Sequence, residues 1–281
     1  MPTQAFFLPA DGPAGGQRLC LYHPAQGTPR GALVYVHPFA EEMNKSRRMA
    51  AVASRAFADA GYAVLQIDLF GCGDSSGDFG DAAWGDWVDD VVQGARWLQD
   101  RVDAPLWLWG LRAGCLLTCE AARRLSAPPS LLWWAPVTSG KLQWQQFLRL
   151  KTAAEMLQGQ AGGGAAALKA ELAAGRPVEV AGYLIAPALA QGLERASLSA
   201  VATVPRLQVL EAGAQGADPS PAVANLLSAW QREGVPAAAA PCAGPAFWQT
   251  SEIEEAPAFI ERSLASLRAV AAPIDTAGVA A

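Results

Sequence analysis

Histidine is the scarcest catalytic residue type in this chain, which has 281 residues and only two histidines, His23 and His37. Because no histidine follows position 37, a reaction that needs an imidazole base later in the chain has none to use. The same scarcity, together with five cysteines that lack metal-ligand spacing, predicts no metal site. Cys115 and Cys119 lie in an apolar helical segment and are expected to be buried thiols.

Clustered positive charge, long apolar runs and nucleotide-binding glycine motifs are also missing. The net charge is −5 and the basic residues are dispersed, which excludes a nucleic-acid-binding surface. The longest apolar runs are too short to span a membrane, and the first residues lack the basic and apolar segments of a secretion signal. Neither a dinucleotide fingerprint nor a P-loop is present, so no cofactor is predicted. We expect a soluble, cytoplasmic protein.

Apolar segments with strand character alternate with amphipathic helical segments over most of the chain. The expected strands cover residues 31–37, 62–68, 105–109, 130–134 and 204–210. The expected helices cover residues 46–60, 84–102, 112–125, 221–233 and 252–269. Continuous apolar strands separated by helices indicate an α/β protein, with a mostly parallel sheet and helices on both of its faces. In such a sheet the functional site lies at the carboxyl ends of the strands.

This alternation stops between residues 137 and 203, where helical, Gly/Ala-rich and mixed apolar stretches follow one another. Such a segment between two strands predicts an inserted helical lid, with part of the Gly/Ala-rich stretch forming a mobile loop. The expected core therefore comprises residues 1–136 and 204–269. Residues 270–281 are expected to form a disordered tail.

One strand-to-helix junction has the spacing of a nucleophile elbow. The segment LWLWGLRAG, residues 106–114, places Gly110 and Gly114 on either side of a central residue, as in the G-x-S-x-G motif. The central residue is Arg112, whose guanidinium cannot lose its proton near neutral pH and so cannot attack a carbonyl. The motif therefore predicts the backbone of an acyl-transfer site without its nucleophile.

The order of these parts resembles the α/β-hydrolase superfamily. His37-Pro38-Phe39 stands where that superfamily has its oxyanion loop, and DLFGCGDS, residues 68–75, is similar to its D-x-R-G-x-G-x-S loop. The resemblance implies an α/β-hydrolase fold with a lid in the usual place. The segments HPFAEEMNKSRRM, WGLRAG and PAFWQTSEIEEAP further resemble the group named exosortase A system-associated hydrolase 2. That group implies a context of exosortase and exopolysaccharide systems, beside a second hydrolase.

The catalytic triad that this resemblance implies is incomplete. Arg112 occupies the nucleophile position, and Phe247 occupies the position of the histidine base. Asp218, or less favourably Glu211, occupies the acid position after the strand at 204–210. Because removal of either the nucleophile or the base typically lowers the rate by several powers of ten, we predict a catalytically inactive protein.

A true hydrolase or acyltransferase of ester, thioester or amide bonds, using non-standard residues, is the alternative. His37 is its best candidate for a base, since it stands at the expected site. Ser75 and Ser76 lie in a turn-rich loop with no histidine clearly poised to activate them, and Cys115 is expected to face the core.

The charge of Arg112 requires a negative group nearby, because the residue precedes a helix whose N-terminus is itself partly positive. Within the chain the candidates are Glu41, Glu42, Asp218 and Glu211. Outside it, a carboxylate or phosphate could bind, since arginine suits such anions and a pocket is common at this place. The predicted ligand-binding residues are Arg112, Ala113, Leu111, His37, Phe39, Glu41 and Trp248.

Three functions follow from these patterns. The chain could bind a small anionic or acyl ligand without catalysis, or it could be the partner subunit of an active paralogous hydrolase. The third is the non-standard enzyme. Homodimerisation is a further option that the sequence leaves open.

Overall fold

The computed structural model describes residues 2–157 and 164–270. Residues 158–163 lie outside the described residues, and they include 161–163, the start of the Gly/Ala-rich stretch in which a mobile loop is predicted. The predicted tail, residues 270–281, also lies outside the described residues, apart from its first residue, which ends the last helix.

Eight strands form one sheet in the spatial order β1-β2-β4-β3-β5-β6-β9-β10. They are β1 (Gln4–Pro9), β2 (Gln17–His23), β3 (Gly31–Val36), β4 (Tyr62–Ile67), β5 (Leu106–Leu111), β6 (Ser130–Trp134), β9 (Leu207–Ala212) and β10 (Ala237–Cys242). The pairs β1–β2 and β2–β4 are antiparallel, and the other neighbouring pairs are parallel. This arrangement confirms the predicted mostly parallel sheet.

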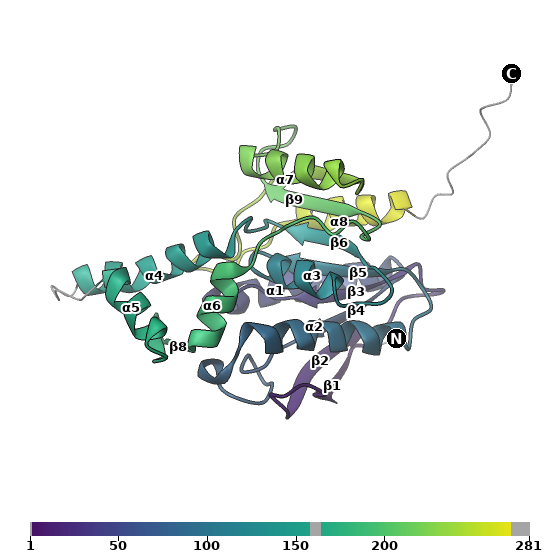
Figure 1. The fold of residues 1–281 in the computed structure, drawn as a ribbon. Coiled ribbons are helices and arrows are strands. Elements are labelled where there is room, and N and C mark those ends of the chain that lie inside the picture. The colour runs from purple at the N-terminus through teal and green to yellow at the C-terminus, as the bar shows by residue number, and fades with distance from the viewer. Residues whose placement is uncertain (1, 158–163, 271–281) are drawn as a thin grey trace, which may run out of the picture.

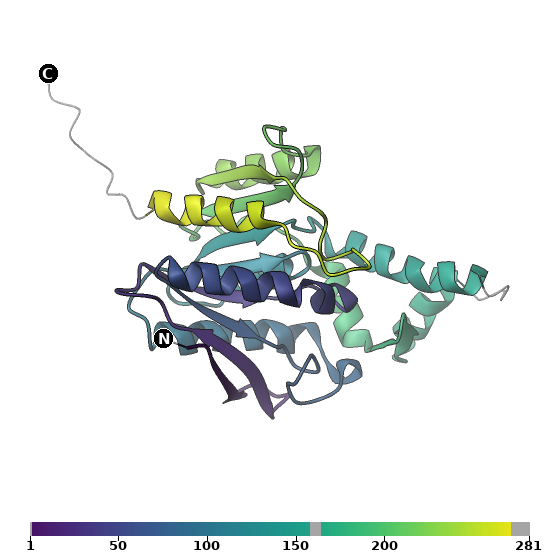
Figure 2. The same cartoon turned by 180° about the vertical axis from the view of Figure 1, so that it is seen from behind.

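Helices cover both faces of this sheet (Figures 1 and 2). On one face lie α1 (Glu41–Asp59) and α8 (Pro257–Val270), and on the other lie α2 (Trp84–Gln99), α3 (Gly114–Ala122) and α7 (Pro221–Arg232). Successive residues of a strand point to opposite faces, so the continuous apolar strands supply both cores. In β5, for example, Trp109 packs with Phe57 of α1, whereas Leu108 belongs to the core beneath α2 and α3.

The segment between β6 and β9, called the insertion below, is mainly helical. It contains α4 (Gly140–Leu157), α5 (Gly164–Ala173), a hairpin of β7 (Val178–Val180) and β8 (Tyr183–Ile185), and α6 (Pro187–Arg195). It extends from one side of the sheet (Figure 1). Gly192 anchors it, because α6 approaches the Trp84 side chain of α2 so closely that a β-carbon would overlap it. A gating role for the insertion stays a prediction.

Several boundaries differ from those expected. The first helix begins at Glu41 rather than residue 46, and the helix after the elbow covers only Gly114–Ala122. Within the Gly/Ala-rich stretch, residues 164–173 form α5, because their alanine, leucine and lysine side chains favour helix. The last helix begins at Pro257, whose fixed φ suits a first turn.

Candidate functional site

The turn between β5 and α3 has the backbone of a nucleophile elbow. Arg112 has φ 54°, in the left-handed region that non-glycine residues enter only at a cost. Both glycines of the motif are required by close packing. A β-carbon on Gly114 would overlap the carbonyl of Val36 in β3, and one on Gly110 would lie 2.7 Å from the backbone nitrogen of Cys115.

We therefore expect Gly114→Ala to lower the free energy of unfolding by about 1–3 kcal/mol, as overpacking against fixed backbone does. Urea denaturation would measure the loss. Gly85→Ala is the control, because a β-carbon there would meet nothing within 4 Å. Equal stability of the two variants would contradict the close contact between the elbow and β3.

The guanidinium of Arg112 is paired within the protein. Its Nε donates to Oε1 of Glu42 at 3.3 Å, and its Nη1 donates to the Ala135 carbonyl at 3.3 Å. The guanidinium carbon also lies 5.5 Å from the centroid of the Trp248 ring. Of the four internal carboxylates considered, Glu42 is thus the partner. It reaches Arg112 because α1 begins just after β3, the neighbour of β5 in the sheet.

Because this ion pair is buried, each of its charges depends on the other for compensation. The side chains of Arg112 and Glu42 are 15% and 9% exposed. Burial raises the pKa of the Glu42 carboxyl, while Arg112 and the Gln249 amide oppose that rise. Two further residues beside the pair, Ala40 and Ala135, also have positive φ, of 53° and 44°. Unfavourable backbone therefore concentrates around this ion pair, as it often does at functional sites.

The side chains at the predicted base and acid positions do not form a catalytic group. Phe247 is fully buried in an aromatic cluster with Trp134, Trp248 and Phe259. Asp218 is exposed in the loop that follows β9. The Glu211 carboxylate accepts a hydrogen bond of 2.9 Å from the backbone N–H of Ser220, which holds the start of α7.

His37 has no ring nitrogen available for a substrate. Its Nδ1 lies 2.8 Å from the Pro38 carbonyl, and its Nε2 accepts from the backbone N–H of Leu69 at 3.3 Å. This pattern assigns the proton to Nδ1. Burial also lowers the pKa of the ring. The contacts of His37 therefore do not support the alternative role of a catalytic base. They hold the segment predicted to be the oxyanion loop in place instead.

The candidate nucleophiles Ser75 and Cys115 are not available to a substrate either. The Ser75 hydroxyl donates to the Asp68 carbonyl at 2.6 Å and accepts from the backbone N–H of Leu19. Cys115 is fully buried, and burial raises the pKa of its thiol well above the usual value. A thiol kept protonated in this way is not a nucleophile.

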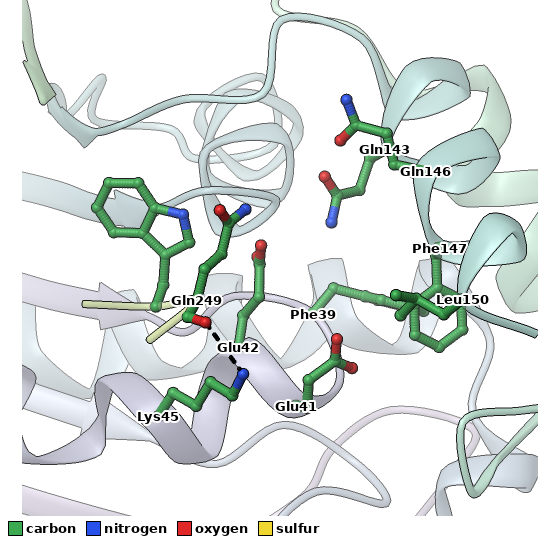
Figure 3. Close-up of a pocket in the computed structure, with 10 residues that line it drawn as sticks. Phe39, Glu41, Glu42, Lys45, Gln143, Gln146, Phe147, Leu150 and Gln249 are labelled. Atoms are coloured by element: carbon green, nitrogen blue, oxygen red, sulfur yellow. Dashed lines mark hydrogen bonds between the residues drawn. The ribbon is translucent and has the colours of Figure 1, made fainter. Parts of the chain in front are cut away.

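A pocket of about 280 Å³ opens beside the ion pair, between α1 and the insertion. Figure 3 shows side chains of α1 and α4 facing each other across it. Its lining consists of Phe39, Glu41, Glu42, Lys45, Gln143, Gln146, Phe147, Leu150, Trp248 and Gln249. Lys45 closes one side by donating from Nζ to the Gln249 carbonyl at 3.3 Å.

The pocket brings together only part of the predicted ligand set. Phe39, Glu41 and Trp248 line it. Arg112 lies behind Glu42, and the other three predicted residues are buried outside the lining, namely Leu111, Ala113 and His37. Sequence patterns missed the insertion's contribution, chiefly Gln143 and Phe147, because nothing in an amphipathic helix tells which core segment it will face.

The sequence predicts that metal sites and membrane-spanning helices are both absent. Among the described residues, no group of three or more histidine, cysteine, aspartate or glutamate side chains is arranged to hold a metal ion. No described helix combines the length and apolar character that a membrane crossing requires.

Comparisons with known proteins agree on the fold. The family model of serine aminopeptidases, S33, matches residues 27–161. Est1E from Butyrivibrio proteoclasticus, solved with ferulic acid bound, is 13% identical, with a TM-score of 0.64 over 95% of this chain and 97% of that one. GrgF, an α/β hydrolase from Penicillium sp. sh18, is 18% identical, with a TM-score of 0.63 over 96% and 99%.

A serine hydrolase without a lid, XC6422 from Xanthomonas campestris, is 18% identical, with a TM-score of 0.54 over 96% of this chain and 93% of that one. No curated protein matches the sequence. The sheet order, the elbow and these similarities together confirm the predicted α/β-hydrolase fold.

Proposed function

We propose that this protein does not catalyse acyl transfer and instead uses the pocket beside its elbow to bind a small ligand. The observation that carries the proposal is the ion pair of Arg112 and Glu42, which fills the nucleophile position with a charged group held from within. The similarity to serine aminopeptidases implies a serine at that position, which this chain lacks.

The pocket has the features of a binding site. It is concave and lined by aromatic side chains with a few polar groups between them, as ligand pockets generally are. The structure gives little support to the anionic ligand predicted from the sequence, since the guanidinium that would attract an anion already contacts Glu42.

We also propose an association with exosortase and exopolysaccharide systems. Its support is the resemblance in three segments, each of which supplies residues of this site. HPFAEEMNKSRRM contributes the α1 side of the pocket, WGLRAG contributes Arg112, and PAFWQTSEIEEAP contributes Trp248 and Gln249. Loss of exopolysaccharide after deletion of the gene, restored by the wild-type gene, would support it; unchanged exopolysaccharide would contradict it.

Turnover assays test the inactive state directly. We expect no hydrolysis of nitrophenyl esters, thioesters or anilides above that of the Arg112→Ala variant. Arg112→Ser should remain inactive too, because Phe247 offers it no base. Turnover by the wild-type protein that is lost in His37→Ala would contradict the proposal and favour the enzyme with non-standard residues.

A partner-subunit role has one structural observation in its favour. Three leucines of the insertion are strongly exposed, Leu142 (52%), Leu150 (42%) and Leu184 (46%), and a partner that covered them would remove apolar surface from water. Co-expression with a paralogous hydrolase, followed by size-exclusion chromatography, tests it. We expect a shared peak, whereas two separate monomer peaks would contradict it.

A further inference from the structure

We propose that the pocket beside the elbow binds a small organic cation, namely a primary ammonium group carried on an apolar body. The proposal rests on the ligand-binding function proposed above and specifies the ligand's chemistry. It differs from the anionic or acyl ligand that the sequence suggests, because it follows from the groups that remain unpaired once Arg112 has contacted Glu42.

Among the buried polar side-chain atoms of the pocket lining that lack a partner, three are acceptors and one, Nε1 of Trp248, is a donor. Oε2 of Glu41, Oε2 of Glu42 and Oε1 of Gln143 are shielded from water and accept no hydrogen bond within the described residues. Glu42 and Gln143 are only 7% and 6% exposed, so solvent does not compensate for the missing donors. An ammonium group brings three N–H donors and no acceptor, which matches this set of oxygens.

The acceptors come from two separate parts of the fold. Glu41 and Glu42 lie in the first turn of α1, whereas Gln143 lies in the first turn of α4, in the insertion. Figure 3 shows the glutamates and the insertion's glutamines on opposite sides of the pocket. A ligand donor between them would join core and insertion, so the unpaired atoms are not a local feature of one helix.

The charges around the pocket also favour a cation. Arg112 is neutralised by Glu42, and the Lys45 ammonium points to the Gln249 carbonyl in a contact exposed to solvent. Glu41 forms no ion pair within the described residues. A bound ammonium would therefore meet the Glu41 carboxylate and Oε2 of Glu42, neither of which accepts the Lys45 ammonium of the same lining.

The rest of the lining fits the apolar body of the ligand. Phe39 and Phe147 pack edge to face with ring centroids 5.0 Å apart, and Trp248 and Leu150 extend the apolar wall. Aromatic faces also attract organic cations. A volume of about 280 Å³ equals that of about nine water molecules, so it suits a ligand with roughly ten non-hydrogen atoms.

Three probes of matched size test the proposal by calorimetry: phenethylammonium, phenethyl alcohol and phenylacetate. We expect phenethylammonium to bind at least about tenfold more tightly than either of the others. The indole N–H signal of Trp248 in the NMR spectrum, assigned with Trp248→Phe, should shift on binding.

Glu41→Gln should weaken the binding of phenethylammonium about tenfold and leave the binding of phenethyl alcohol unchanged. Gln143→Leu should also weaken the binding of phenethylammonium. Glu254→Gln, an exposed residue outside the lining, is the control for the change of charge.

Tighter binding of phenylacetate, or no binding of phenethylammonium up to about 10 mM, would overturn the ammonium site. The same samples are incubated with phenethyl acetate. Its hydrolysis would contradict the inactive state whatever the binding result, so failure of this inference is distinguishable from failure of the proposed function.

Discussion

Arg112→Met should be among the most destabilising single changes in this protein at pH 8, lowering the free energy of unfolding by about 3–5 kcal/mol. The substitution keeps most of the side chain's apolar volume but removes the charge that faces Glu42. The Glu42 side chain, 9% exposed in the wild-type protein, would then have no cation to compensate for its burial. The hydrogen bond to the Ala135 carbonyl would be lost at the same time.

The loss should depend on pH in a defined direction. Burial already raises the folded-state pKa of Glu42, and without Arg112 that pKa rises further. Between the unfolded pKa, about 4.3, and the higher folded pKa, the folded variant binds more protons than its unfolded state. Its stability is therefore greatest below the unfolded pKa and falls as the pH rises through the folded one. Urea denaturation at acidic and alkaline pH should show a deficit, relative to wild type, that grows with pH.

The double variant Arg112→Met/Glu42→Gln supplies the control. With no buried charge on either side, it should recover much of the stability lost by the single variant and should lose the pH dependence of the deficit. Arg48→Met removes one partner of an exposed pair, whose side chains are 63% and 36% exposed, and should change stability little. A deficit in Arg112→Met that is independent of pH would show that Glu42 is not the group responsible.

The parts of the site that sequence patterns predict are those set by local backbone chemistry. The glycine spacing around Arg112 predicts the elbow because a sharp strand-to-helix turn needs residues without a β-carbon at its close approaches. The missing base follows from residue identity alone, since no histidine exists after position 37. The need for a negative partner follows from placing a cation at a helix N-terminus.

The choice of partner and the shape of the pocket could not be predicted in the same way. Glu42 and Asp218 are equally plausible by sequence, and only the adjacency of β3 and β5 brings the first within reach of Arg112. The polar face of α4 looks like any solvated helix surface. Gln143 becomes a site residue only because the first turn of α4 lies across the pocket from α1, where Gly140 packs against α6 and α6 packs against Trp84.

Phe247→His, which places an imidazole where the sequence resemblance predicts the base, should lower the free energy of unfolding by about 3 kcal/mol rather than create a base. Phe247 is fully buried, with ring centroids 5.0 Å from Trp248, 5.8 Å from Phe259 and 6.3 Å from Trp134. An imidazole there would lose aromatic contact area and would bury two nitrogens among apolar rings. Thermal and urea denaturation would measure the loss.

Phe247→Leu is the matched control, since it shortens the side chain without adding a polar group and should cost less, under about 1.5 kcal/mol. The difference between the two variants isolates the cost of burying the imidazole. If Phe247→His were instead as stable as wild type, the new ring would need hydrogen-bond partners that the aromatic cluster does not supply, which would contradict the closed cluster. A closed aromatic cluster predicts the opposite. Under the proposed inactive state, the paired cation at the elbow and this aromatic cluster are two separate packing features that a working triad would have to replace.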